Sequence, residues 1–357
     1  MISRTRKSIL FMSFTLIIIF LCMLFKDQIK LNIKNNEFCN KVFFLINNEI
    51  NNVRKNIIRK HVNLDKNQLL LYSPSTSELE IYSLLPDNNI LTTKFIKKDW
   101  GTWNIQGWYI VSDNNIPSKS LHLLAGGGTD WEYVFRVAKN FGDAYVFSGG
   151  NHGRESLEDI RLLNAEDGSE LKLQPGEKVK INALKIVENT FLTFDEALTQ
   201  KYSEVQRTYI IFPTKILLET DFNFIYDVYM GTSYVCMFPT TKEHGRYIRF
   251  DDTARTYETP KSGDTLTENG HTNYLGYEKS LSATIWGDSV YKYEFKIQID
   301  NIDMVDGFKN KLKTFYWDVN KIGNKLYFSK FDNDEYKKIE AGTTWHNVSS
   351  WEINLKN

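Results

Sequence analysis

The sequence predicts a mainly β protein, an antiparallel β-sandwich or jelly roll with few short helices, preceded by one N-terminal transmembrane helix. Three observations support this prediction. An uncharged apolar run occupies residues 9–25. After residue 64 the chain becomes a series of short runs rich in Val, Ile, Tyr, Phe, Trp and Thr, which are the residues enriched in strands. Gly, Asn and Asp separate many of these runs, as tight turns between antiparallel strands require.

The apolar run ILFMSFTLIIIFLCMLF at residues 9–25 predicts a signal anchor that stays in the membrane. A membrane-spanning helix needs about 17–25 apolar residues, whereas the core of a cleaved signal peptide is shorter and ends at small residues, which are missing here. Residues 1–8 contain Arg4, Arg6 and Lys7. By the positive-inside rule we expect this end in the cytoplasm and the C-terminal domain in the periplasm or outside the cell.

The chain beyond the anchor divides into a spacer and a globular part. Residues 26–62 are rich in Asn, Lys and Ile with apolar residues three and four apart, a spacing that predicts a short helical stalk. Residues 63–357 are expected to form one β-rich extracytoplasmic domain, with a sub-boundary near residue 175. An apolar content of 42% is enough for a sizeable core.

Short apolar or alternating runs mark the expected strands. They lie at 69–73, 79–85, 107–112, 121–126, 144–149, 208–212, 233–238, 246–250, 282–286, 290–299 and 325–331. Asp167 and Gly168 stand between two alternating runs and predict a hairpin turn. Two segments predict short helices, 193–202 and 130–140, the second with an N-cap at Thr129 or Asp130.

Charge and cysteine content exclude several classes of protein. Lys plus Arg and Asp plus Glu both number 44, so the chain as a whole has no basic footprint for nucleic acid. Cys22, Cys39 and Cys236 form no CxxC pair, and either a Cys39–Cys236 disulfide or two separate thiols fits the sequence. No cofactor motif such as a P-loop or GxGxxG is present, and we expect no cofactor.

The densest group of polar and glycine residues lies between Gly126 and Ser156. There the strand-like AYVFS is followed by GGNHGRE, which predicts a tight loop at a strand end. Glycine permits positive φ and lets the backbone approach a ligand closely. The loop residues Asn151, His152, Arg154 and Glu155 are therefore candidates for a site in which an imidazole transfers a proton beside a bound anion. A turn whose polar side chains satisfy local backbone groups is the structural alternative.

A second group of His, Arg and Tyr residues lies between 244 and 277. HGRYIRF contributes His244, Arg246, Tyr247 and Arg249, while ENGHTNYLGY contributes His271 and Tyr274. Arg and Tyr on one strand are more often a solvated face than a site.

Together, the two groups contain what β-elimination of an acidic sugar polymer needs: a carboxylate neutraliser, a base for the C5 proton and an acid for the leaving oxygen. His152, His271 and Tyr274 are the predicted catalytic residues. The predicted substrate-binding residues are Asn151, Arg154, Glu155, Arg246, Tyr247 and Arg249. A Tyr acid needs its pKa lowered by positive charge, which Arg246 or Arg249 could supply. A metal site of His152, His244 and His271 is a weaker alternative, because no HExxH or compact His pair is present.

The stretches GGGTDWEYVFRV and FSGGNHGRE resemble the GTDxE and GGxHGxE pattern of polysaccharide-lyase-like β-sandwich modules in phage tail and bacterial surface proteins. The resemblance covers about thirty contiguous residues. It implies a glycan-active β-sandwich with His152 as a functional residue and with Asn151, Arg154 and Glu155 near the substrate. Arg154 stands where the pattern has a small or acidic residue, which puts the role of that position in doubt.

These patterns favour an envelope-anchored enzyme that cleaves an acidic polysaccharide by β-elimination. A non-catalytic glycan-binding or adhesion module and a structural envelope component are the alternatives. The catalytic reading requires the loops at 149–155 and 268–277 to meet in space, because catalytic groups must reach one substrate.

Overall fold

The structure is a computed structural model that describes residues 64–113, 115–267, 273–304, 314–331 and 337–356. The predicted cytoplasmic segment, signal anchor and stalk lie outside these residues, as do Cys39 and His271. Among the described residues, no helix has the length and apolarity needed to cross a membrane. All of them fall in one compact unit, 61–357.

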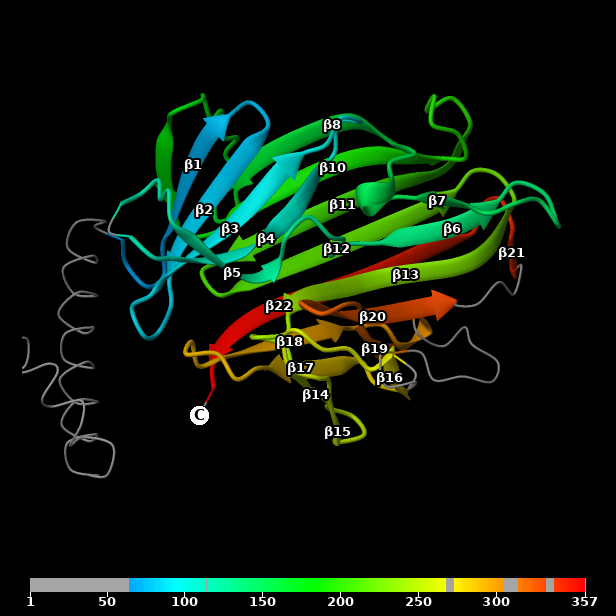
Figure 1. Ribbon diagram of the computed structural model, residues 1–357. Helices are drawn as coiled ribbons and strands as arrows, with labels where there is room; N and C mark the ends of the chain where they lie inside the picture. Colours follow the sequence, from blue (N-terminus) through cyan, green and yellow to red (C-terminus); the bar gives the residue numbers. More distant parts are fainter. Residues whose placement is uncertain (1–63, 114, 268–272, 305–313, 332–336, 357) are drawn as a thin grey trace, which may run out of the picture. The chain divides into compact units, whose positions relative to one another are not determined.

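The described chain forms two antiparallel sheets of thirteen and nine strands (Figure 1). The larger sheet contains β1 (Leu69–Ser75), β2 (Glu78–Leu84), β3 (Ile90–Lys97), β4 (Trp103–Val111), β5 (Leu121–Gly126), β6 (Val134–Ala138), β7 (Val146–Ser148), β9 (Lys178–Ile181), β13 (Val228–Thr241), β16 (Tyr274–Glu278), β19 (Thr314–Asp318), β20 (Gly323–Phe331) and β21 (Lys337–Ile339). The smaller sheet contains β8 (Glu155–Asn164), β10 (Leu184–Thr193), β11 (Lys201–Phe212), β12 (Lys215–Phe224), β14 (Tyr247–Phe250), β15 (Arg255–Glu258), β17 (Ser282–Trp286), β18 (Tyr293–Ile299) and β22 (Thr344–Leu355). The prediction of a mainly β protein with two antiparallel sheets is confirmed. A jelly roll divides eight strands between its two sheets, and each sheet here has more than eight by itself.

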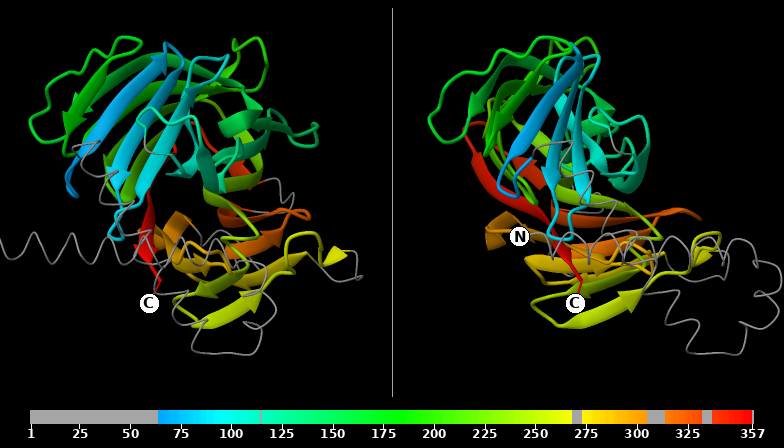
Figure 2. Two further views of the ribbon diagram at one scale, coloured as in Figure 1. Left: turned by 60° about the vertical axis from the view of Figure 1, so that its left-hand side comes forward. Right: turned by 90° about the vertical axis from the view of Figure 1, so that its left-hand side faces the viewer.

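The two sheets pack face to face. In Figure 1, β6, β7 and β13 of the larger sheet lie in front of β11, β12 and β22 of the smaller one, and Figure 2 shows the two layers from the side. Along β11, Val205, Tyr209 and Ile211 are buried, while Glu204 and Gln206 on either side of Val205 are exposed. This period of two sends one side of each strand into the core and the other to the surface.

The larger sheet follows the chain as a meander from β1 to β5, and β13 then connects β5 to β20 and β19. β13 pairs with β20 along one edge and with β6 along the other, so only β13 separates β20 from β6. Pro175 and Gly176, the predicted sub-boundary, lie between β8 of the smaller sheet and β9 of the larger one. Cys236, in β13, is a buried free cysteine.

The two predicted helices are wrong. No α-helix is present among the described residues, whose helical geometry is of the 3-10 type, as in η1 (Gly150–His152) and η3 (Ile302–Met304). Residues 130–140 contain β6, because Trp131, Tyr133, Phe135 and Val137 repeat every second position and all enter the core.

Residues 193–202 contain the end of β10, the hairpin connection at 194–200 and the start of β11, not a helix. The Asp195 carboxylate accepts hydrogen bonds from the backbone N–H groups of Thr199 and Gln200, at 3.0 and 2.8 Å. An Asp side chain that satisfies nearby backbone groups in this way stabilises a turn at the expense of a helix.

Candidate functional site

The predicted polar loop connects β7 to β8 and includes the turn η1. Gly149, Gly150 and Gly153 have positive φ angles of 86°, 54° and 67°. At Gly150 an added Cβ would lie 2.3 Å from Asp130 Oδ1, so no larger residue fits without movement. The Asn151 backbone N–H donates to that same Oδ1 at 2.5 Å, and Asn151 Nδ2 donates to the Gly128 carbonyl at 2.7 Å. These contacts hold the loop against the segment that precedes β6.

Asp130 links His152 to a lysine from β20. Its Oδ2 lies 3.3 Å from Lys325 Nζ and 3.9 Å from His152 Nε2. The Lys325 side chain is only 8% exposed, whereas the His152 side chain is 42% exposed and can reach a ligand. The imidazole stacks on the Phe147 ring, with centroids 4.7 Å apart.

The surroundings of His152 favour its neutral form. Burial lowers its pKa below the ordinary value of 6.5, the negative charge of Asp130 raises it, and Lys325 and Arg154 lower it further. Burial also lowers the pKa of Lys325, although Asp130 opposes this effect. A neutral, half-exposed imidazole beside a carboxylate is the arrangement that a general base requires.

A set of aromatic residues continues from Lys325 on the same face of the larger sheet. Lys325 lies directly opposite Trp317 in β19, which lies opposite Tyr274 in β16. Directly opposed residues point to one face, with Cβ atoms about 4.5–5.5 Å apart. The Tyr274 and Trp317 rings are stacked at 5.7 Å, and Lys325 Nζ lies 5.1 Å from the Tyr327 ring centroid.

We call this set of rings the aromatic face; Phe315 and Tyr327 are buried within it, and the other rings are partly exposed. Its rings belong to Tyr234, Tyr274, Tyr277, Phe315, Trp317 and Tyr327. They come from β13, β16, β19 and β20, and Tyr234 lies opposite Val134 of β6.

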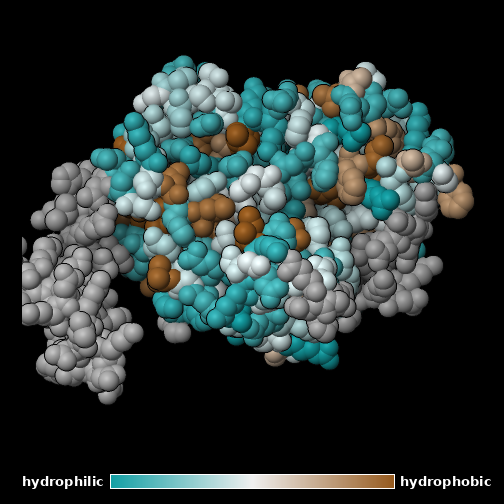
Figure 3. All heavy atoms as spheres, in the orientation of Figure 1, coloured by the Kyte–Doolittle hydropathy of each residue, from teal (hydrophilic) through white to brown (hydrophobic). Residues whose placement is uncertain are grey.

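A second cation lies on the β6 and β7 side of His152. The Arg136 guanidinium lies over the rings of Tyr145 and Phe147, 4.8 and 5.8 Å from their centroids. Figure 3 shows hydrophobic residues gathered over β6 and β7 on this side of the molecule. Phe147 is therefore in contact with both the His152 imidazole and the Arg136 guanidinium.

Glu155 lies in the core, whereas Arg154 lies close enough to His152 to lower its pKa. Glu155 is fully buried, where it accepts hydrogen bonds from the Tyr133 hydroxyl at 2.5 Å and from Thr190 Oγ1 at 2.8 Å. Arg154 donates to Glu196 Oε1 at 2.7 Å and to the Phe147 carbonyl at 3.0 Å. This placement does not support substrate contact by Glu155, because Glu155 begins β8 with its side chain directed into the core.

Glu155 belongs to a buried charge network between the sheets. Arg207 Nε donates to Glu188 Oε2 at 2.5 Å, and Arg207 Nη1 lies 3.7 Å from Glu155 Oε1. Glu188 also accepts from the Trp103 backbone N–H at 2.8 Å. Burial raises the pKa of Glu188 even though Arg207 lowers it. No side chain of this pair or of Glu155 is exposed, so the network is structural.

Arg246, Tyr247 and Arg249 lie at β14 of the smaller sheet, apart from the aromatic face of the larger sheet. Arg246 pairs with Glu258 and with Asp288, the second at 2.6 Å, and Arg249 pairs with Asp251 at 3.0 Å.

Tyr247 stacks on Trp286. Its pKa is raised by burial and by the charges of Asp288 and Glu258, against the lowering effect of Arg246. At Tyr247 the lowering effect of Arg246 is therefore outweighed by burial and by the two carboxylates.

The predicted His152, His244 and His271 metal set is not brought together among the described residues. His244 Nε2 lies 2.9 Å from Nε2 of His122, near the start of β5. Asn151, beside His152, contacts Gly128, just beyond the other end of β5. At about 3.3 Å per residue, the four residues from His122 to Gly126 alone span roughly 13 Å. His271 lies outside the described residues.

Sequence reasoning missed the partners of His152 among the charged residues. The sequence indicates Asp130 only as a helix cap and does not single out Lys325, which lies beside Asp130 in the structure. The alternation in KLYFSKF already places Lys325 and Tyr327 on one face of a strand, and this signal could have found them.

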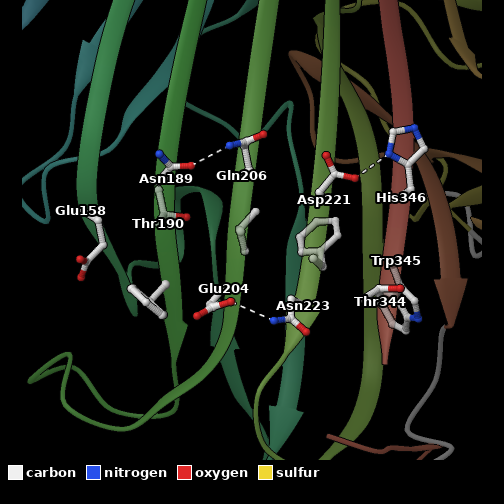
Figure 4. A pocket seen from close by; sticks show the side chains of 13 residues that line it. Glu158, Asn189, Thr190, Glu204, Gln206, Asp221, Asn223, Thr344, Trp345 and His346 are labelled. Atoms are coloured by element: carbon white, nitrogen blue, oxygen red, sulfur yellow. Dashed lines mark hydrogen bonds and ion pairs between the residues drawn. The ribbon is translucent and has the colours of Figure 1, made fainter. Parts of the chain in front are cut away.

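A separate groove of about 640 Å³ lies on the exposed face of the smaller sheet (Figure 4). It is lined by Glu158, Asn189, Thr190, Phe191, Glu204, Val205, Gln206, Asp221, Phe222, Asn223, Thr344, Trp345 and His346. Its polar side chains pair across neighbouring strands. Gln206 donates to Asn189 at 3.0 Å, Asn223 donates to Glu204 at 2.8 Å, and His346 Nδ1 lies 2.7 Å from Asp221 Oδ1. Because these groups satisfy one another, the groove is a weaker candidate than the His152 surroundings.

No family model matches the chain, and no curated protein sequence is significantly similar to it. Several solved structures align with most of this chain at very low identity. The galactosidase domain of an α-galactosidase–sucrose kinase is 8% identical with a TM-score of 0.44, and 81% of this chain aligns with 42% of that chain. The α-galactosidase from Lactobacillus brevis is 8% identical with a TM-score of 0.44, over 80% of this chain and 40% of that chain. An aldose epimerase homologue from C. elegans is 11% identical with a TM-score of 0.32, over 75% of this chain and 96% of that chain.

This chain therefore spans about two fifths of the length of those galactosidase structures. All three of these proteins have names that refer to carbohydrates. A likeness with TM-scores below 0.5 assigns no activity to this chain.

Proposed function

We propose that this chain binds an acidic polysaccharide on the aromatic face of the larger sheet and cleaves it by β-elimination, with His152 as the base. The observation that carries the proposal is the convergence of His152 and Lys325 on Asp130, beside the rings of the aromatic face. The proposal includes the predicted single-pass anchor at residues 9–25 and a domain outside the cytoplasm.

The aromatic face offers binding surface for sugar rings. Trp317 and Tyr274 present stacked rings from adjacent strands, and Tyr274 is 37% exposed. Aromatic side chains combine large apolar area with a polar edge, which suits a ligand that has both apolar and hydroxyl surfaces. Lys325 and Arg154 bring positive charge close to His152, which favours an anionic ligand.

The proposed reaction needs two proton transfers, one from C5 of the uronate and one to the leaving oxygen. Neutral His152 takes the C5 proton of the uronate. The electron pair of that C–H bond forms the C4–C5 double bond, and the C4–O bond breaks. The leaving oxygen receives a proton from the Tyr274 hydroxyl. Asp130 orients the imidazole and stabilises its protonated form.

The test is the ultraviolet absorbance of unsaturated uronate while the purified full-length chain acts on a panel of uronate-containing polysaccharides. The variant is His152→Ala, and the matched control is His346→Ala, which removes an exposed histidine that also contacts an aspartate. We expect the control to keep its activity and the His152 variant to lose about 10²–10⁴-fold.

Unchanged turnover in a folded His152→Ala variant would remove His152 from the mechanism. Binding of polysaccharide without product, lost in Trp317→Ala, would indicate a glycan-binding module. Neither binding nor product would favour a structural envelope component.

A further inference from the structure

Two histidines from distant parts of the chain meet near the start of β5. His122, in β5, and His244, after β13, approach through the same ring atom, with Nε2 to Nε2 at 2.9 Å. The carboxylate of Glu243 joins them, and one ligand atom from each of the three residues lies within 4.8 Å of the others. His244 is buried, His122 is partly buried and Glu243 is exposed, so the group opens to solvent on one side.

The turn that carries Glu243 and His244 is held in place by its backbone. The N–H groups of His244 and Gly245 both donate to the Thr241 carbonyl, at 3.1 and 2.8 Å. A Cβ on Gly245 would lie 2.0 Å from the Thr240 side chain, so this close approach requires glycine.

Lys242 anchors the same turn. Its ammonium lies 2.6 Å from Asp318 Oδ1, and neither side chain is exposed. It also donates to the Asp264 carbonyl at 2.5 Å. Glu243 and His244, which follow Lys242, therefore lie on a segment that these contacts hold in place.

The aromatic ring of Tyr291 packs beside both histidines, with centroids 5.1 Å from His122 and 6.2 Å from His244. Packing on one side of the imidazoles limits their rotation and keeps the two Nε2 atoms directed toward each other. The Glu243 carbonyl accepts from the Ser289 N–H at 3.2 Å, which ties the turn to the segment that contains Tyr291.

We propose that His122, Glu243 and His244 bind a divalent transition-metal ion of the zinc type. Two imidazole nitrogens and one carboxylate form a His₂Glu ligand set, which leaves a fourth tetrahedral position for water or another ligand. Zn–N bonds of about 2.0–2.1 Å in a tetrahedron place the two nitrogens about 3.3 Å apart, so the rings need to separate by only a few tenths of an ångström. Imidazole ligands favour Zn²⁺, Cu²⁺ and Ni²⁺ over Mg²⁺ and Ca²⁺.

This inference goes beyond the proposed function and does not depend on it. It also replaces the predicted partner of His244, because His122 and not His152 stands beside it. The structure offers a matched comparison in Glu219, Asp221 and His346, which also lie within 4.8 Å of one another. All three are exposed and only one is an imidazole, so we expect weak binding there.

The experiment is a competition titration of the purified, tag-free full-length chain with Zn²⁺ and a chromophoric chelator, after prior metal removal. The variants are His122→Ala and Glu243→Gln, and the control is His346→Ala. We expect one Zn²⁺ per chain in the natural protein and in the control. We expect more than about tenfold weaker binding in the other two variants, since even the loss of an outer-shell partner costs about 10–100-fold. Excess Mg²⁺ should not compete.

Co²⁺ provides a second readout, because a tetrahedral site gives intense visible absorption, which the two variants should lose and His346→Ala should keep. Thermal unfolding in metal-free buffer shows whether each variant is folded. If His122→Ala is not folded, Glu243→Gln, an exposed isosteric change, carries the test. Zinc affinity that is unchanged in the folded variants, or that falls only in His346→Ala, would overturn the proposal and leave a hydrogen-bonded histidine pair.

Discussion

Replacing Arg207 by Met tests whether the buried charge network holds the two sheets together. Arg207 donates to Glu188 at 2.5 Å and to the Trp103 carbonyl at 3.1 Å, and it lies 3.7 Å from Glu155. Its side chain and both carboxylates are 0% exposed. Methionine fills similar space without charge, so the variant leaves two buried carboxylates without their cation.

The expected loss of unfolding free energy is about 3–5 kcal/mol, the cost of removing one partner from a buried ion pair. Arg246→Met is the control, because Arg246 also contacts two carboxylates, Glu258 and Asp288. Those two side chains are 52% and 54% exposed, and Arg246 itself is 15% exposed. Exposed pairs contribute about 0–1 kcal/mol, so the control should cost at most about 1 kcal/mol.

The loss in Arg207→Met should also depend on pH. Burial already raises the pKa of Glu188 in the folded protein, and removal of Arg207 raises it further. A carboxyl with a raised folded-state pKa favours folding at low pH and loses this contribution as pH rises. The deficit should therefore be smaller at pH of about 4 than at pH of about 7.

Urea unfolding of the natural chain and of both variants, at these two pH values, measures the difference. Equal losses in Arg207→Met and Arg246→Met, or a loss in Arg207→Met that grows toward low pH, would refute this account of the network.

Two further predictions concern the site. Lys325→Met should raise the pKa of His152, because Lys325 lowers it in the natural protein. The acidic limb of the rate profile, expected below pH of about 6.5, should then move to higher pH. NMR titration of the ring measures the pKa, and an unchanged His152 pKa would contradict the prediction. Gly150→Ala should cost about 1–3 kcal/mol or more, since φ is 54° and the Cβ would meet Asp130 at 2.3 Å. Gly168→Ala, with φ of 74° and open space around it, carries the backbone strain alone, so thermal unfolding should show the larger loss in Gly150→Ala.

Local pattern was enough to predict strands and the polar loop. β-branched and aromatic runs with period two predicted the sandwich, and the glycines around Asn151 and His152 predicted a tight turn that the structure contains. The error at 130–140 arose because acidic residues near its start resemble a helix N-terminus, while the alternation of Trp131, Tyr133, Phe135 and Val137 had more weight in the folded protein. Burial of four large side chains on one face outweighs a local capping preference.

The sequence by itself determined the β class, the turn glycines and the candidacy of His152, because these depend on neighbours within a few residues. Only the tertiary structure decided the partners. Lys325 reaches Asp130 from 195 positions away, and His122 meets His244 from 122 positions away. Tyr247 and Arg249 follow a strand pattern as regular as that of Lys325 and Tyr327, yet they lie on the other sheet. Period two tells which residues share one side of a strand, but strand pairing depends on how both sheets together bury their apolar sides, and that is a property of the whole chain.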